Sequence, residues 1–171
     1  SDPVKRILDR EPGLTIAPCQ LRPQSRGSIH AASPDPRADP AIRPNFLAEE
    51  ADRRTLADGM KAARRVLAEN PLAAHVVRER RPGPEAADDA DLIAYARETG
   101  VTLYHPVGTA KMGSADDKMA VTDHHLRVHG LDGLRIVDAS VMPRLISGNT
   151  NAPVMMIAEK AADMIKADAK A

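Results

Sequence analysis

A histidine in a stretch containing proline and glycine is the strongest candidate for catalytic chemistry in this chain. His105 directly precedes Pro106 and lies three residues before Gly108, and both shape the backbone around it. An imidazole accepts and releases a proton near neutral pH without strong tuning, so His105 could serve as a general acid or base. By residue type alone, a structural histidine remains the more common alternative.

Three further histidines raise the question of a zinc site: His124, His125 and His129. No cysteine or fourth ligand joins them. In a strand, alternation would place His125 and His129 on one face with Arg127 between them, too far apart to share one small ion. The sequence therefore predicts no metal site.

Three segments in the second half of the chain carry a more specific signal. They are residues 104–113 (YHPVGTAKMG), 133–143 (GLRIVDASVMP) and 147–160 (SGNTNAPVMMIAEK). In order and spacing they resemble the C-terminal part of the glucose-methanol-choline (GMC) family of flavin-dependent alcohol oxidoreductases. Residues 21–27 (LRPQSRG) look like the start of the family's C-terminal region, so the resemblance spans most of the chain.

The resemblance implies roles for two side chains. At its motif position His105 would be the catalytic acid/base, and Asn149 would face the substrate oxygen, where the family has either His or Asn. An amide can donate one hydrogen bond to an alkoxide and accept another, but it does not readily take a proton. Counted from residues 154–159, Asn149 is the match, and Asn151 is interpreted as the cap of a final helix.

The same resemblance implies FAD as cofactor. In the family, the N-terminal end of the last helix faces the flavin pyrimidine ring, which corresponds here to Asn151, Ala152, Pro153 and Val154. Free N–H groups and the helix dipole favour negative charge at such an end. Asp138 and Ala139 resemble the family's other flavin-contacting stretch, through backbone more than side chain. By residue type alone, Asp138 is a turn or cap acceptor.

One expected motif is missing. None of the ten glycines forms the Gly-x-Gly-x-x-Gly turn with which this family holds its dinucleotide. We therefore expect a C-terminal piece of a longer enzyme, with FAD present in the full-length parent and not held by this chain alone. Its partners would be the missing N-terminal FAD-binding part and a small-molecule alcohol. Apolar surface left uncovered would favour self-association.

Composition narrows the remaining classes. The chain has 24 basic and 24 acidic residues, so nothing in its charge points to nucleic acid. No apolar run approaches the ~18 residues of a membrane span, and we expect a cytoplasmic location. The single Cys19 cannot form an internal disulfide and is expected to be buried. Three aromatic residues, Phe46, Tyr95 and Tyr104, offer little material for a cage around a quaternary ammonium such as choline.

Helical signals lie in three places. Residues 52–68 predict the clearest amphipathic helix, and its buried face would hold Leu56, Met60, Ala63 and Leu67. A second helix would start at Asp88 or Asp91 and stop at Gly100. A third would start near Asn151, with one apolar face made by Ile157, Ala161 and Ile165.

Strand signals are shorter. Residues 14–16, 28–32 and 42–46 predict strands, the last an edge strand weakened by Pro44. Residues 126–129 and 134–137 predict a strand–turn–strand unit. Strands mixed with helices without strict alternation favour an α+β fold, here a mainly antiparallel sheet with flanking helices.

The resemblance implies how this fold is divided. Residues 1–122 would be the substrate-binding domain of a two-domain flavoenzyme, and residues 123–171 a strand, turn and helix that complete the FAD-binding domain. The implied activity is oxidation of an alcohol to an aldehyde or ketone, by proton abstraction and hydride transfer to flavin. Two alternatives stay open: a non-catalytic, stand-alone substrate-cap module, and a related carbon–oxygen lyase or oxidase.

Overall fold

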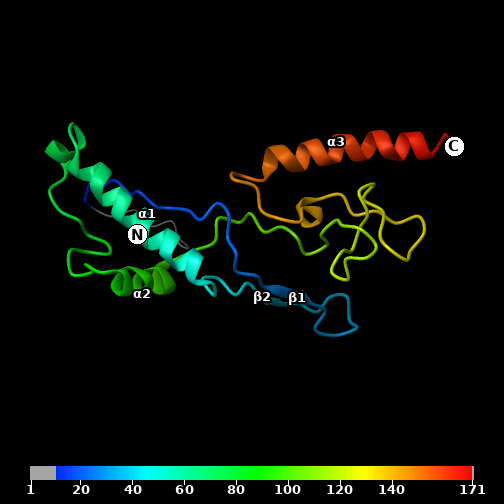
Figure 1. The fold of residues 1–171 in the computed structure, drawn as a ribbon, viewed down its shortest axis with the longest axis horizontal. Coiled ribbons are helices and arrows are strands. Elements are labelled where there is room, and N and C mark those ends of the chain that lie inside the picture. Colours follow the sequence, from blue (N-terminus) through cyan, green and yellow to red (C-terminus); the bar gives the residue numbers. More distant parts are fainter. Residues whose placement is uncertain (1–10, 171) are drawn as a thin grey trace. The chain divides into compact units, whose positions relative to one another are not determined.

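The computed structural model describes residues 11–170, which contain three α-helices, a two-stranded sheet and two short 3₁₀ helices (Figure 1). In chain order the elements are β1 (Ser28–His30), β2 (Ala41–Arg43), α1 (Glu50–Ala68), η1 (Leu72–His75), α2 (Asp89–Thr99), η2 (Ala139–Val141) and α3 (Asn151–Asp168). The class is α+β and the sheet is antiparallel, as the sequence predicts. Within the described range the sheet is much smaller than expected.

The chain divides into two compact units. Within the described residues, unit 1 comprises 11–20, Gln24–Arg26 and Asn45–Leu103, and unit 2 comprises Leu21–Pro23, Gly27–Pro44 and 104–170. These units reflect contacts inside this chain. The predicted boundary between residues 122 and 123 concerns the domains of a whole flavoenzyme, and it stays a prediction.

Unit 1 is built on α1 and α2, which pack side by side (Figure 1). Its core contains Ala57, Ala86 and Leu92. As predicted, Asp88 caps α2 by accepting a hydrogen bond from the Asp91 N–H, and Gly100 is the C-cap residue. Local signals therefore set both ends of α2.

The buried side of α1 differs from the prediction. Four apolar residues expected to be buried are only half-buried: Leu56, Met60, Ala63 and Leu67. The fully buried residues of α1 are Asp52 and Ala57. Ala57 shares the core cluster with Leu92 of α2. The buried face of α1 is therefore centred on Ala57, whose small side chain lets α2 approach.

A buried carboxylate fixes the start of α1. Asp52 is 1% exposed, and its oxygens accept hydrogen bonds from Gln20 Nε2, the Gln24 N–H, and the N–H and hydroxyl of Ser25, at 2.5–3.1 Å. Burial raises the pKa of Asp52, but the hydrogen bonds from Ser25, Gln24 and Gln20 outweigh it, and the pKa lies below its ordinary value. The charged carboxylate thereby ties these three residues to the helix.

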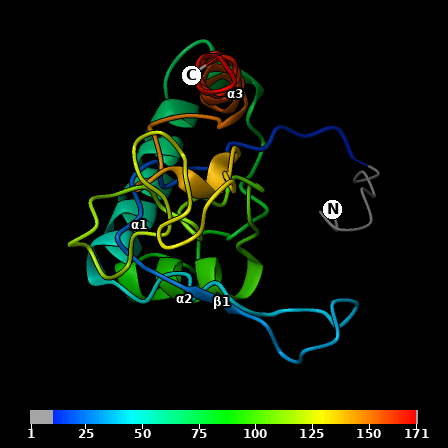
Figure 2. The same cartoon turned by 90° about the vertical axis from the view of Figure 1, so that its right-hand side faces the viewer.

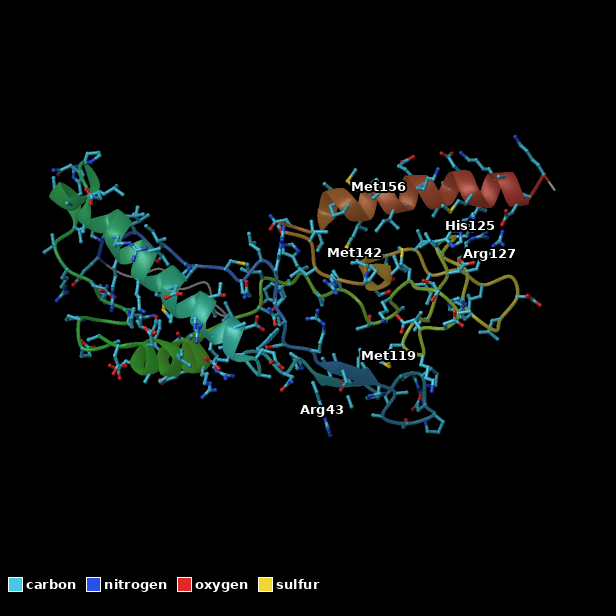
Figure 3. All side chains as sticks on the ribbon, in the orientation of Figure 1. Arg43, Met119, His125, Arg127, Met142 and Met156 are labelled. Atoms are coloured by element: carbon cyan, nitrogen blue, oxygen red, sulfur yellow. The ribbon has the colours of Figure 1, made fainter. Side chains whose placement is uncertain are left out.

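The core of unit 2 lies against α3, which Figure 2 shows almost along its axis. The buried residues are Leu126, Val141, Met142, Ile157 and Ala161. Met142, the C-cap residue of η2, is buried in this core, whereas Met156 of α3 points away from it (Figure 3). Of the apolar face predicted for the last helix, Ile157 and Ala161 are buried, but Ile165 is 46% exposed because the cluster does not reach it.

The sheet is a short hairpin in unit 2. Ile29 of β1 lies opposite Ile42 of β2. A Cβ on Gly27 would lie 2.2 Å from the carbonyl oxygen of Arg43, so the strand entry requires glycine. The predicted strands at 28–32 and 42–46 are therefore present in shorter form, and the second begins one residue earlier.

Of two other strand predictions, one is wrong and one is confirmed only in part. Residues 14–16 form no strand, since Leu14 and Ile16 are exposed and no described segment pairs with their backbone. The predicted strand–turn–strand unit occurs as a single antiparallel bridge between Arg127 and Arg135. Its turn contains Gly133 with φ +74°, a left-handed conformation suited to glycine. The unit is thus a tight loop and not a pair of regular strands.

Two expectations from composition concern the burial of Cys19 and the presence of membrane-spanning helices. Cys19 is exposed, so the expected burial is wrong; it lies in an irregular segment outside the core of unit 1. Among residues 11–170, no helix is both long enough and apolar enough to cross a membrane.

Candidate functional site

The backbone around His105 is tightly constrained. Tyr104 has φ +60°, which residues other than glycine seldom adopt, and Gly108 has φ +87°. A Cβ on Gly108 would lie 3.3 Å from the carbonyl oxygen of Met142. Such conformations persist only where the surrounding structure enforces them, and they gather at functional sites. This path leaves His105 half-buried.

A hydrogen bond to a residue far away in sequence orients the His105 ring. Its Nδ1 lies 2.9 Å from Oγ1 of Thr150, 45 residues later in the chain. Thr150 is only 7% exposed. The bond uses one ring nitrogen, and Nε2 remains the atom that can meet a substrate.

The predicted partner Asn149 is the residue immediately before Thr150. Its side chain is exposed and makes no hydrogen bond within the described part of the chain. Two residues before Asn149, the Ser147 hydroxyl accepts a 2.6 Å hydrogen bond from Nε of Arg22. His105 and Asn149 are thus linked through Thr150, with one imidazole nitrogen and one amide left for a ligand.

The start of α3 offers backbone donors. The helix begins at Asn151, and the cap residue is Thr150, so the prediction that Asn151 is the cap is wrong by one position. The Thr150 side chain bonds no helix N–H, because it is engaged with His105. The first backbone bond into the helix runs from the Val154 N–H to the Thr150 carbonyl, which leaves the N–H groups of Asn151 and Ala152 without an acceptor in the helix. Pro153 has no N–H to satisfy.

The second predicted cofactor stretch has its side chain occupied. Asp138 accepts hydrogen bonds from the N–H of Ser140 at 2.8 Å and from the Ser140 hydroxyl, and it caps η2. The alternative role as a cap acceptor is therefore observed, and it uses Oδ1 of the side chain. Ala139 and Val154 both pack against the unit 2 core cluster, so the two predicted cofactor stretches border the same core.

These features fit a flavin in one specific respect. A ring that gains negative charge on reduction requires hydrogen-bond donors or positive potential nearby. Uncapped N–H groups at the exposed start of α3 supply both.

Several other charged and imidazole groups near the motifs make contacts of their own. Lys111 donates a 2.5 Å hydrogen bond to Asp117 and lowers the pKa of that carboxyl. His129 Nε2 lies 3.2 Å from the Gly113 carbonyl oxygen, and the His124 and His125 rings are in contact, with centroids 4.3 Å apart and planes tilted by 48°. No group of three potential metal ligands comes together in the residues that the structure describes.

Sequence reasoning missed Thr150. Its residue type was the available signal, because a threonine directly before a helix normally caps it. The structure places its hydroxyl on His105 instead, which no local pattern indicates.

Comparisons with known proteins bear on these residues. The model of the family described as GMC oxidoreductase, for its C-terminal domain, matches residues 23–158. The chain is similar to the oxygen-dependent choline dehydrogenase of Stenotrophomonas maltophilia (strain K279a), with 48% identity over 146 residues, covering 85% of this chain and 26% of the relative. It is 45% identical over 153 residues to an alcohol dehydrogenase [acceptor] of Pseudomonas putida, covering 90% of this chain and 27% of that one.

The fold is also similar to that of a solved flavoenzyme structure. An FAD-dependent oxidoreductase from Chaetomium thermophilum superposes with a TM-score of 0.82 at 26% identity, over 88% of this chain and 26% of that chain. The chain thus spans about a quarter of the length of the relatives it matches.

Proposed function

This chain belongs to the GMC oxidoreductase family, and from that premise we propose that the protein carrying it oxidises an alcohol to an aldehyde or ketone with FAD as acceptor. One observation supports the proposal: Thr150 holds His105 through Nδ1, which leaves Nε2 for a substrate, and the next residue towards the N-terminus of Thr150 is the exposed Asn149. A base and an oxygen-binding donor are the two groups that removal of an alcohol proton requires.

In this proposal His105 is the acid/base. Its Nε2 accepts the hydroxyl proton of the alcohol as the carbonyl double bond forms. Asn149 donates a hydrogen bond from its amide to the same oxygen and stabilises the alkoxide charge that develops there. Because an amide cannot take the proton, the two residues have different roles.

FAD, when bound, would accept the two electrons and the hydrogen that leave the alcohol carbon. The residues that would contact it are the backbone of Asp138 and Ala139 and the first turn of α3, from Asn151 through Ala152 and Pro153 to Val154. The uncapped N–H groups of that turn support the assignment, since they would favour negative charge on the ring.

The domain roles follow from the same proposal. Residues 1–122 would contribute to the substrate-binding domain, and residues 123–171 would complete the FAD-binding domain. On α3, Met155 is 62% exposed and Met156 is 60% exposed. Apolar side chains exposed in this way suit a surface that the rest of the enzyme covers, or that promotes self-association of the chain when it is separate.

The substrate class is a CH–OH donor. The relatives are named for choline and for alcohols, and Phe46, Tyr95 and Tyr104 are the only aromatic residues here that could help hold a quaternary ammonium. We therefore propose a small alcohol and leave choline as one member of the test panel. The cytoplasmic location likewise remains a proposal from the sequence.

The experiment uses the full-length protein that carries this chain. We expect the flavin absorbance spectrum, and its bleaching under anaerobic conditions by at least one primary or secondary alcohol. The matched control is the methyl ether of the same alcohol, which has no hydroxyl proton for His105 and should leave the flavin oxidised. A protein without flavin, or one that reacts equally with the ether, would contradict the proposal.

One observation favours the stand-alone cap module as the behaviour of the separate 171-residue chain. None of its ten glycines forms the dinucleotide-binding turn. We therefore expect equilibrium dialysis of the chain against FAD to show no retained flavin, and micromolar or tighter binding would exclude this alternative.

A further inference from the structure

We propose that Thr150 is a positioning residue that sets the orientation of the His105 ring; this inference rests on the proposed function of that histidine. The geometry that points to it is the 2.9 Å separation between Thr150 Oγ1 and His105 Nδ1. Thr150 does not touch the substrate. It acts through the imidazole.

The hydroxyl of Thr150 is available for this role because it does not cap α3. A threonine at an N-cap position normally accepts a hydrogen bond from a helix N–H. Here the side chain makes no such bond, and its backbone lies in the helical region at φ −85° and ψ −11°. The residue is nearly buried, so water has little access to compete for its hydroxyl.

A hydroxyl suits an imidazole that must change protonation state. When Oγ1 accepts a hydrogen bond from Nδ1–H, the proton stays on Nδ1 and the Nε2 lone pair can receive the substrate proton. After that transfer the ring carries protons on both nitrogens, and the same Nδ1–H···Oγ1 bond persists. The ring therefore accepts the proton without reorienting and without a new hydrogen-bond partner.

The packing of Thr150 helps to hold this geometry. A β-branched side chain has few χ1 rotamers, so its hydroxyl direction is well defined when the residue is buried. The following residues begin α3, whose Ile157 and Ala161 are fixed in the unit 2 core. His105 is thus oriented by an element that the fold itself anchors.

Substitutions at Thr150 test the proposal in the full-length flavoenzyme. Thr150→Val keeps the shape and removes the hydroxyl, and Thr150→Ser keeps the hydroxyl. We expect Thr150→Val to slow anaerobic flavin reduction by roughly tenfold, the size of one hydrogen bond, with little change in KM or in the thermal unfolding midpoint. Thr150→Ser should restore most of the rate. Thr109→Val, a loss of the same group at an exposed position, is the matched control.

A double mutant separates this inference from the function on which it rests. If Thr150 acts through His105, then Thr150→Val adds little to the defect of His105→Ala. Near-wild-type reduction by His105→Ala would overturn the proposed function itself. A slow His105→Ala together with a fast Thr150→Val, or a Thr150→Ser as slow as Thr150→Val, would overturn only the role of Thr150. If Thr150→Val does not fold, Thr150→Ala replaces it in the same comparison.

Discussion

Asp52 allows a sharp test of how this fold is held together. The carboxylate is buried, and the partners that it binds through Oδ1 and Oδ2 come from residues 27 to 32 positions earlier in the chain. Asp52→Asn keeps the shape but replaces one acceptor oxygen by a donor. If the amide nitrogen takes the place of Oδ2, the N–H of Ser25 loses its acceptor; if it takes the place of Oδ1, the side chain of Gln20 loses its acceptor and the Gln24 N–H keeps only its longer bond. In either orientation the remaining bonds lose the help of the charge.

The expected loss is about 2–4 kcal/mol in the free energy of unfolding, from one unsatisfied buried donor and weaker bonds to a neutral group. Urea unfolding followed by circular dichroism measures it, and amide hydrogen exchange at Gln24 and Ser25 locates it. Glu50→Gln is the control, because Glu50 is also acidic and in the first turn of α1 but exposed, and it pairs with the exposed Arg54 at 2.7 Å. That change should cost less than about 1 kcal/mol.

The pH dependence follows from the lowered pKa of Asp52. A carboxyl with a folded pKa below its ordinary value of 3.8 contributes stability that is fully present above that value. This stability is lost as the pH falls through the lowered folded value. Asp52→Asn should therefore remove part of the acid sensitivity below about pH 4. An unchanged unfolding curve for Asp52→Asn, or amide exchange at both Gln24 and Ser25 no faster than in the wild type, would refute the reasoning.

Three further substitutions test the packing of unit 2. Thr122 is fully buried and its hydroxyl has no hydrogen-bond partner among the described residues, so Thr122→Val should leave thermal stability unchanged or raise it by up to about 1 kcal/mol. Gly27→Ala should separate β1 from β2, because its Cβ would meet the Arg43 carbonyl oxygen at 2.2 Å; faster limited proteolysis of the hairpin loop is the readout. Gly108→Ala should cost about 1–2 kcal/mol at its positive φ, measured by urea unfolding.

The helices could be predicted because their signals are local. The Asp88 cap and the Gly100 stop lie within one turn of the helix that they bound, and both are observed. The extended segments depended on partners that the sequence does not name. Residues 14–16 have the composition of a strand but no neighbour to pair with in the described chain, and only short pairing forms elsewhere.

The site was predictable in its residue types and not in its contacts. His105 and Asn149 stand out through the motifs around them, whereas the Thr150 contact depends on the fold joining segments 45 residues apart. The same holds for Asp52, read from sequence as a helix start, whose burial depends on a distant loop. The roles of the two candidate catalytic residues stay predictions until they are measured.

The most direct test of the account is anaerobic stopped-flow reduction of the full-length flavoprotein by its alcohol, comparing wild type, His105→Ala and Asn149→Ala. A general base contributes about 10²–10⁴-fold, so His105→Ala should slow reduction by that factor while FAD remains bound. Asn149→Ala should lose about 1.5–3 kcal/mol, the worth of one hydrogen bond to a charged oxygen. If His105→Ala reduces its flavin at nearly the wild-type rate, the assignment of the base fails, and His124, His125 or His129 must be considered in its place.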